Sequence, residues 1–229
     1  FGAKDFGLVF DIALHGGTLA AVIFYFKDDL VRLVQAWIPW NSQRNTEDFN
    51  LGLHLIVATM PIVLVGLIFS DVIAERTSSI ESIAWANLIF AGLLWFAFKY
   101  SPQTKNLVGL TVLAALVVGC LQALAIFPGA SRSGMAITGA LLIGLNLKES
   151  SKFAFLLSIP TILGALILMV LKDAFVLTAD DFMILLTGFI GSAIIAFLTI
   201  KVFLQFVEKI GMTPFVMYRL LLGLALLLL

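Results

Sequence analysis

Charged side chains are scarce in this sequence. Lys, Arg, Asp and Glu make up 12% of the 229 residues, whereas 61% of the residues are hydrophobic. Soluble domains carry about 25% charged residues, so this chain could not cover its surface with polar groups. Long uncharged apolar runs separate the few charges, which favours membrane-spanning helices over a barrel.

Two further features of the composition limit which partners and which cross-links the chain can have. The basic and acidic residues balance, with 14 of each, so charge gives no reason to expect nucleic acid as a partner. A single cysteine, Cys120, excludes an intrachain disulfide framework. The bilayer is therefore the first partner that we expect.

Apolar segments divided by charged residues predict the helices. We expect an all-α polytopic membrane protein of one domain, residues 1–229, with about six transmembrane helices and one re-entrant helix-loop-helix. The expected spanning helices are Phe6–Phe26, Leu51–Phe69, Ile83–Phe98, Phe153–Leu171, Phe182–Val207 and Pro214–Leu229. The segment Lys27–Trp40 is amphipathic and is expected to lie at the membrane interface.

Residues 107–147 are expected to form the re-entrant hairpin. Leu107–Phe127 is long enough to span the membrane. Met135–Leu147 would rise only about 20 Å, well short of the ~30 Å hydrocarbon core. The loop P-G-A-S-R-S-G between these two segments is therefore expected at membrane depth.

Lys and Arg are distributed unevenly between the two sides of this topology. One side receives Lys27, Arg32, Arg44, Lys99, Lys105, Lys148, Lys152 and Lys209, and the other receives Arg76 and Lys172. By the positive-inside rule the first side is cytoplasmic.

A weak internal repeat relates Phe10–Asp28 to Phe155–Asp173, in which Phe, Ala and the terminal Lys-Asp coincide. Chance similarity between two membrane helices explains this match equally well. If the repeat is real, residues 1–106 are the remainder of a first repeat and residues 107–229 are the second. The hairpin of the first repeat would then lie upstream of Phe1. Paired re-entrant hairpins place binding sites near the membrane midplane.

The loop itself is rich in hydrogen-bond donors. Pro128 and Gly129 should end the preceding helix. The next helix, expected after Gly134, would present free N–H groups and the positive end of its dipole to the loop.

Side chains add to these backbone donors. Ser131 and Ser133 contribute hydroxyls, and Arg132 contributes a permanent charge with a planar donor fork. A phosphate or diphosphate is the ligand that such a set favours.

A purely structural Arg132, paired with a carboxylate or with helix carbonyls, is the alternative. No acidic residue occurs between Glu81 and Glu149, so a partner would have to come from another helix. An unpaired arginine inside the membrane costs at least ~2.5–3.5 kcal/mol, which makes a functional role the default hypothesis.

Two familiar phosphate chemistries do not fit the loop. Met135 and Ala136 stand where a nucleotide-binding P-loop has Lys and Ser/Thr. A phosphatase with a histidine nucleophile would need a histidine shortly after the loop, and the only histidines are His15 and His54.

Several segments resemble one family in order along the chain. They are F-D-I-A-L-H-G-G-T-L, I-V-A-T-M-P-I-V-L-V-G, L-Q-A-L-A-I-F-P-G, F-A-F-L-L-S-I-P-T-I-L-G-A and G-M-T-P-F-V-M-Y-R-L-L-L-G. The loop P-G-A-S-R-S matches the opening of that family's signature P-G-x-S-R-S-x-x-T. On these residues the chain resembles the undecaprenyl-pyrophosphate phosphatase family, also called bacitracin-resistance proteins, essentially from end to end.

The sequence departs from the family pattern in two places. The family's acidic signature, E-G-x-x-E-F-x-P-x-S-S followed by Gly-His, is expected before Phe1, so the sequence is either truncated or lacks the acidic half of the site. Ala136 occupies the threonine position of the second signature. Thr138 lies two residues later, roughly 200° around a helix, and does not simply substitute for it.

The resemblance implies hydrolysis of the terminal phosphate of a polyprenyl diphosphate in the bacterial inner membrane. The product would be the carrier lipid monophosphate used in cell-wall assembly. The implied catalytic residues are Arg132, which would hold the phosphate, and Ser131 and Ser133, which would hold its oxygens. The substrate-binding residues that we predict are Gly129, Gly134, Thr138 and Gln122.

Cofactor and partners follow from the same resemblance. It implies a divalent metal ion, Mg or Ca, whose ligands would lie mostly upstream of Phe1. We expect the lipid substrate and the bilayer as partners, expect no nucleic acid, and leave a homodimer open. A lipid-phosphate flippase that uses the same loop without hydrolysis is the alternative function.

Three other polar residues lie in apolar segments. Asp11 and His15 share a helical face, and we interpret them as a structural pair. Arg219 is expected to extend its guanidinium to the membrane interface.

Overall fold

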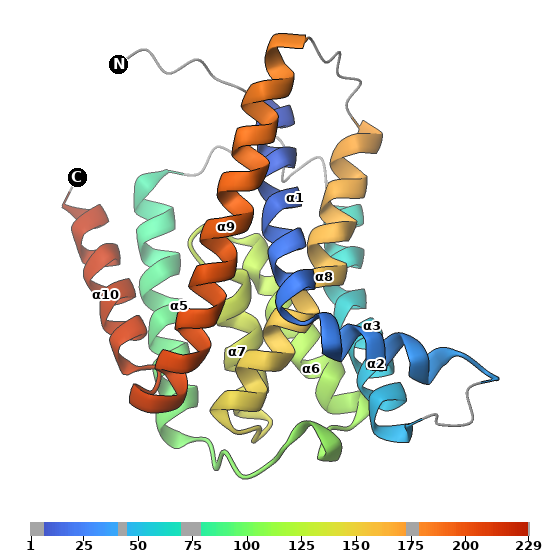
Figure 1. The fold of residues 1–229 in the computed structure, drawn as a ribbon. Coiled ribbons are helices and arrows are strands. Elements are labelled where there is room, and N and C mark those ends of the chain that lie inside the picture. The colour runs from blue at the N-terminus through green and yellow to red at the C-terminus, as the bar shows by residue number, and fades with distance from the viewer. Residues whose placement is uncertain (1–6, 41–44, 70–78, 173–178, 229) are drawn as a thin grey trace.

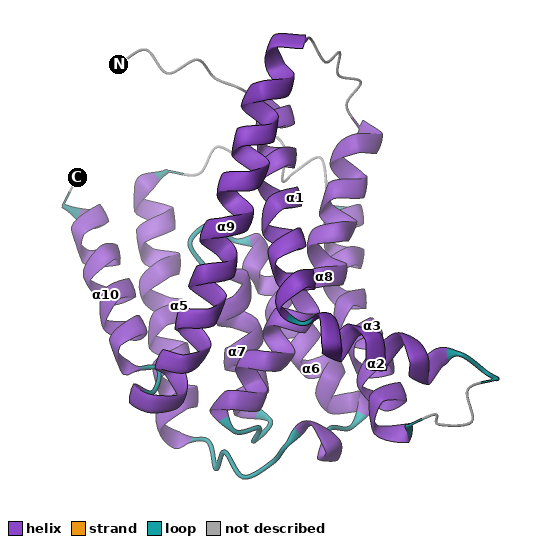
Figure 2. Cartoon of the chain, viewed as in Figure 1, coloured by secondary structure: helices purple, strands orange, loops and turns teal. Residues whose placement is uncertain are grey.

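The structure, a computed structural model, describes residues 7–40, 45–69, 79–172 and 179–228. These residues form a bundle of helices and contain no β-strand (Figures 1 and 2). The helices are α1 (Gly7–Tyr25), α2 (Lys27–Trp37), α3 (Thr46–Ile68), α5 (Ile80–Tyr100), α6 (Val112–Ala123), α7 (Arg132–Leu142), α8 (Leu147–Lys172), α9 (Ala179–Ile210) and α10 (Thr213–Leu227). Helices α3, α5, α8 and α9 contain segments long and apolar enough to cross a membrane, and three shorter apolar helices accompany them. The expected all-α polytopic membrane fold is confirmed.

Polar caps make two spanning helices begin before their apolar segments. Helix α3 begins at Thr46 rather than at Leu51, because the Asn45 side chain accepts a hydrogen bond from the Glu47 N–H (2.9 Å). A Ser79 cap starts α5 in the same way. The apolar pattern alone therefore placed both starts too late.

Helix α6 is shorter than the hairpin arm Leu107–Phe127 that the sequence indicated was long enough to span the membrane. A 3-10 turn and a Thr111 cap precede it, and its α-helical part covers only Val112–Ala123. At 1.5 Å per residue α6 rises ~18 Å and α7 rises ~16 Å, so neither arm crosses the ~30 Å hydrocarbon core. The turn between the two arms lies about halfway up the bundle, below the upper ends of α5 and α9 (Figure 1).

The two arms of the hairpin meet again at its base. The Lys105 N–H donates to the Gly144 carbonyl (2.9 Å), and the Asn146 N–H donates to the Lys105 carbonyl (2.9 Å). Lys105 Nζ also donates to the Ile143 carbonyl (2.9 Å). Gly144 has a φ of +94°, which ends α7 at Leu142, five residues before the expected end at Leu147. The chain leaves the bundle on the side where it entered, so the hairpin is re-entrant.

The helices related by the expected repeat run in opposite directions. Helix α1 descends toward the end of the bundle that holds the hairpin base, whereas α8 ascends from that end (Figure 1). Helix α1 packs against α9, and α8 packs against α3. If α1 and α8 are equivalent helices of two inverted repeats, each of them packs against a helix of the other repeat. The division of the chain at residue 106 stays a prediction.

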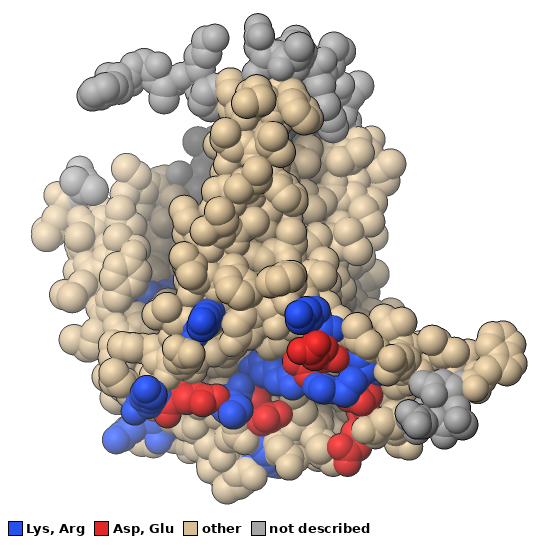
Figure 3. Space-filling view, viewed as in Figure 1, with Lys and Arg blue, Asp and Glu red and all other residues tan. Residues whose placement is uncertain are grey.

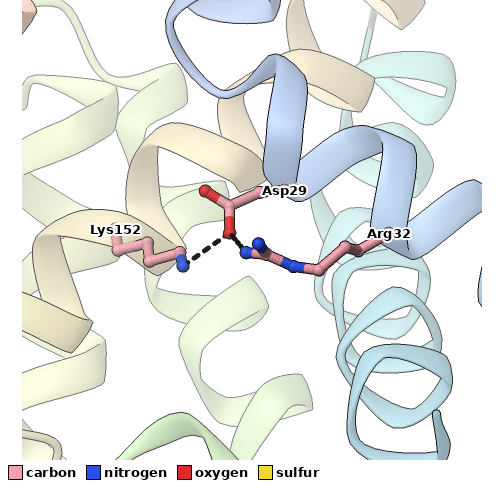
Figure 4. Close-up of polar contacts among 3 residues, drawn as sticks. All are labelled: Asp29, Arg32 and Lys152. Atoms are coloured by element: carbon pink, nitrogen blue, oxygen red, sulfur yellow. Dashed lines mark hydrogen bonds and ion pairs between the residues drawn. The ribbon is translucent and has the colours of Figure 1, made fainter.

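The amphipathic helix α2 turns away from α1 and extends sideways near the lower end of the bundle (Figure 1). Asp29 joins it to α8, because Asp29 Oδ1 accepts hydrogen bonds from Lys152 Nζ (2.7 Å) and from Arg32 of its own helix (Figure 4). Charged side chains of this face gather at the same lower end (Figure 3). Three of the basic side chains that the sequence assigned to one or the other side of the membrane lie outside the described part of the structure. They are Arg44, Arg76 and the side chain of Lys172.

Gly119 determines how closely α6 packs against α3. A Cβ atom there would lie 2.3 Å from the carbonyl oxygen of Ala58, so Gly119→Ala would force the two backbones apart. We expect this variant to lose about 1–3 kcal/mol of stability, measured as a lower midpoint of thermal unfolding in detergent. Gly92→Ala in α5 is the matched control, because a Cβ atom at Gly92 meets nothing within 4 Å. Equal midpoints for the two variants would contradict the prediction.

Candidate functional site

Helix α7 begins inside the P-G-A-S-R-S-G loop, earlier than the expected start after Gly134. Its first residue is Arg132, and its N-cap is Ser131, whose Oγ accepts a hydrogen bond from the Gly134 N–H (3.3 Å). The Ser131 carbonyl accepts from the Met135 N–H (3.0 Å). Arg132 and Ser133 therefore lie in the first helical turn, where backbone N–H groups have no intrahelical acceptor.

Two residues of the loop have a left-handed backbone. The φ of Gly129 is +91° and that of Ser131 is +64°. A Cβ atom on Gly129 would lie 2.4 Å from the carbonyl oxygen of Ile83, so the loop passes directly against the α5 backbone. A positive φ at a residue other than glycine costs of order 1–3 kcal/mol and persists only where surrounding contacts impose it. Ser131 is held in its conformation by the fold.

Several donors of the loop have no acceptor within the described part of the chain. The backbone N–H groups of Ser131, Arg132 and Ser133 donate to no described residue. The Arg132 guanidinium forms no ion pair with a described carboxylate, and its side chain is exposed. Free N–H groups at a helix N-terminus beside a cation form a binding site for an anion such as phosphate.

Arg219 lies beneath this loop, and the expectation that it reaches the membrane interface is wrong. The residue is only 4% exposed. Its Nε donates to Asn87 Oδ1 (2.8 Å), and its Nη2 donates to the carbonyls of Gly129 (2.7 Å) and Ala130 (3.4 Å). Asn87 Nδ2 donates in return to the Arg219 carbonyl (2.7 Å). These acceptors replace water, so the guanidinium has no need to reach the interface.

The remaining predicted residues lie at or below the start of α7. A Cβ atom on Gly134 would lie 3.0 Å from Arg219 Nη1 and 3.1 Å from Ser131 Oγ, so Gly134 adjoins both. Thr138 is fully buried, and its hydroxyl donates to the Gly134 carbonyl (2.7 Å). Gln122 of α6 is 2% exposed, and its Nε2 has no partner among the described residues. The roles of Thr138 and Gln122 in substrate binding stay predictions.

The described residues do not provide a metal site by themselves. They contain no group of three or more His, Cys, Asp or Glu side chains that could hold a metal ion. The Mg or Ca ion implied by the family resemblance therefore stays a prediction. The expected pair of His15 and Asp11 takes another form, because His15 Nδ1 lies 2.8 Å from the backbone carbonyl oxygen of Asp11.

Sequence reasoning missed Asn87 and misplaced Arg219. Asn87 carries a signal of its own, because an amide within the apolar segment A-W-A-N-L-I-F needs a partner inside the bundle. Its pairing with a residue 132 positions later carries no local signal.

Comparison with known proteins matches almost the whole chain to one family. The family model described as bacitracin resistance protein BacA matches residues 1–225. A protein of Saccharophagus degradans named undecaprenyl-diphosphatase is 44% identical over 226 residues, which are 97% of this chain and 84% of that protein. Proteins with the same name from Teredinibacter turnerae and Alcanivorax borkumensis are 42% and 41% identical, covering 97% and 99% of this chain and 84% and 86% of their own lengths.

Gly129→Ala should weaken anion binding at the loop. The positive φ and the Ile83 carbonyl both oppose a Cβ atom, so we expect the affinity for inorganic pyrophosphate to fall about tenfold or more, measured by calorimetric titration. Gly211→Ala is the control, because Gly211 also has a positive φ (+79°) but lies against the Phe98 ring. Unchanged affinity in Gly129→Ala, or an equal loss in Gly211→Ala, would show that the loop does not form the site.

Proposed function

The chain belongs to the bacitracin resistance protein BacA family, and we propose on this basis that it is a membrane phosphatase that hydrolyses undecaprenyl diphosphate. The products are undecaprenyl monophosphate and inorganic phosphate. One structural observation supports the assignment most directly: Arg132, the exposed first residue of α7, forms no ion pair with a described carboxylate. A charge in this position is stable when an anionic group of the substrate accompanies it.

The fold suits a substrate with an apolar tail and an anionic head. The surface of the bundle carries many exposed large hydrophobic side chains, which lipid would surround. The hairpin loop lies between the two ends of the bundle (Figure 1). The polyprenyl tail can therefore stay in the bilayer while the diphosphate reaches the loop.

The loop residues stabilise the charge that moves during hydrolysis. The oxygen of water attacks the terminal phosphorus, the bond from that phosphorus to the bridging oxygen breaks, and the lipid monophosphate leaves with the bridging oxygen. The guanidinium fork of Arg132 and the free N–H groups of Ser131 and Ser133 donate to the phosphate oxygens as charge develops on them. These donors are already oriented by α7, so little reorganisation accompanies the reaction.

We assign the two serines to phosphate binding rather than to nucleophilic attack. No described His, Asp or Glu side chain forms a hydrogen bond with Ser131 or Ser133, and a serine nucleophile needs such a base.

The chain is a multi-pass membrane protein, and we propose the bacterial inner membrane as its location. The end of the bundle that carries α2, the hairpin base and most charged side chains would face the cytoplasm. The lipid substrate and the bilayer are the proposed partners, and a homodimer stays a prediction. No feature of the described residues favours translocation of the lipid without hydrolysis.

Arg132→Ala is the first test of this function. Loss of a preorganised donor for transition-state charge lowers kcat by about 10²–10³. We expect a decrease of this size in phosphate release from undecaprenyl diphosphate by the purified protein. Arg132→Lys should recover only a small part, because an ammonium cannot reproduce the bidentate fork.

Arg32→Ala is the matched control for Arg132→Ala. Arg32 is an arginine of α2 whose partner is Asp29, at the lower end of the bundle, so its loss should leave kcat within about twofold of wild type. Robust turnover in Arg132→Ala would contradict the site assignment. Binding of the lipid by wild-type protein without any phosphate release would contradict the proposed reaction.

A further inference from the structure

The function proposed above uses one arginine, whereas the structure brings two to the start of α7. Arg132 is exposed, and Arg219 is buried behind the loop. Neither guanidinium forms an ion pair with a carboxylate of the described residues. The positive end of the α7 dipole lies at the same place. This part of the molecule therefore concentrates positive charge with no described counter-charge.

Two of the three guanidinium nitrogens of Arg219, Nε and Nη2, donate hydrogen bonds to the protein. Asn87 accepts from Nε, and two successive loop carbonyls accept from Nη2. Its Nη1 is buried and has no partner among the described residues. That atom lies close to Gly134 and therefore to the first turn of α7.

We propose that Arg219 is a positioning residue of the diphosphate site, an inference that rests on the proposed function. The C=O and N–H groups of a trans peptide point in opposite directions. Because the Ala130 carbonyl accepts a hydrogen bond from Arg219 Nη2, the Ser131 N–H of the same peptide group points away from Arg219. Arg219 thus determines the direction of a donor that binds the phosphate, and it does so without touching the substrate.

The same contacts account for the conformation of Ser131. A residue with a φ of +64° requires a restraint from outside the loop. Hydrogen bonds from Nη2 to the Gly129 and Ala130 carbonyls restrain the two peptide groups that precede it. Without them, Ser131 can relax to an ordinary backbone conformation and turn its N–H away from the ligand.

Asn87 transmits the position of α10 to the loop. Its side chain both donates to the Arg219 carbonyl and accepts from Arg219 Nε, which fixes the direction of the guanidinium. A Cβ atom on Gly223 would lie 2.7 Å from Leu88 Cδ2 and 3.2 Å from Asn87 Nδ2, so α10 packs tightly against α5 at this level. Asn87 and Arg219 thus join the loop, α5 and α10.

The test compares Arg219→Lys and Asn87→Ala with wild type in the purified full chain. Lysine keeps the charge but cannot donate to Asn87 and to both loop carbonyls at once. We expect kcat for undecaprenyl diphosphate to fall at least tenfold in Arg219→Lys and by a smaller factor in Asn87→Ala. KM should change less than kcat, because the misdirected N–H matters most when charge develops on the phosphate.

Pyrophosphate binding is the second measurement, and it does not depend on turnover. Calorimetric titration should show weaker binding in both variants, and saturating pyrophosphate should raise the midpoint of thermal unfolding less than it does for wild type. If wild-type protein binds pyrophosphate but releases no phosphate, the proposed reaction fails while this comparison still tests the positioning role.

Arg32→Lys is the matched control, since it makes the same exchange at an arginine outside the site. It should leave kcat, KM and pyrophosphate affinity at wild-type values. The proposal is overturned if folded Arg219→Lys and Asn87→Ala keep wild-type kcat and affinity. It is also overturned if they lose only thermal stability, because Arg219 would then be a purely structural residue. Should Arg219→Lys fail to fold, Asn87→Ala decides by the same criteria.

Discussion

A helix that breaks inside a membrane must find hydrogen-bond partners within the protein, because hydrocarbon offers none. The whole site depends on how the turn between α6 and α7 meets this requirement. Its carbonyls at Gly129 and Ala130 are satisfied by Arg219 of α10. The N–H groups of Ser131, Arg132 and Ser133 are left without described acceptors. Acceptors are thus satisfied inside the protein, and donors remain for a substrate.

The two arginines of the site differ in exposure because their surroundings differ. Arg219 faces an amide and two carbonyls that replace its hydration, so it is stable when buried. Arg132 forms no ion pair with a described carboxylate and is exposed. A buried guanidinium that is fixed by protein atoms shapes the loop, whereas an exposed one is available to a ligand. One residue type serves both purposes.

The sequence predicted most of the fold and pointed to the exposed residues of the candidate site, because both depend on local signals. Apolar runs between charges gave the helices, and Pro128 and Gly129 marked the break before Arg132. The predicted length of α6 was wrong because the Thr111 cap, which starts the helix, lies inside an apolar run. The predicted position of the Arg219 guanidinium at the membrane interface was wrong because its acceptors belong to α5 and to the loop. No pattern along one helix reports contacts between residues so far apart in the chain.

The contact between Arg219 and the loop also bears on how the protein is made. Helices α5, α6 and α7 precede α10 in the chain, so they enter the membrane before their partner has been synthesised. Until α10 packs against α5, the Gly129 and Ala130 carbonyls lack the donor that holds them. The hairpin is therefore synthesised before the arginine that holds its loop, and the loop can take its observed conformation only after α10 has packed. Packing of α10 against α5 would thus be the step that completes the proposed diphosphate site.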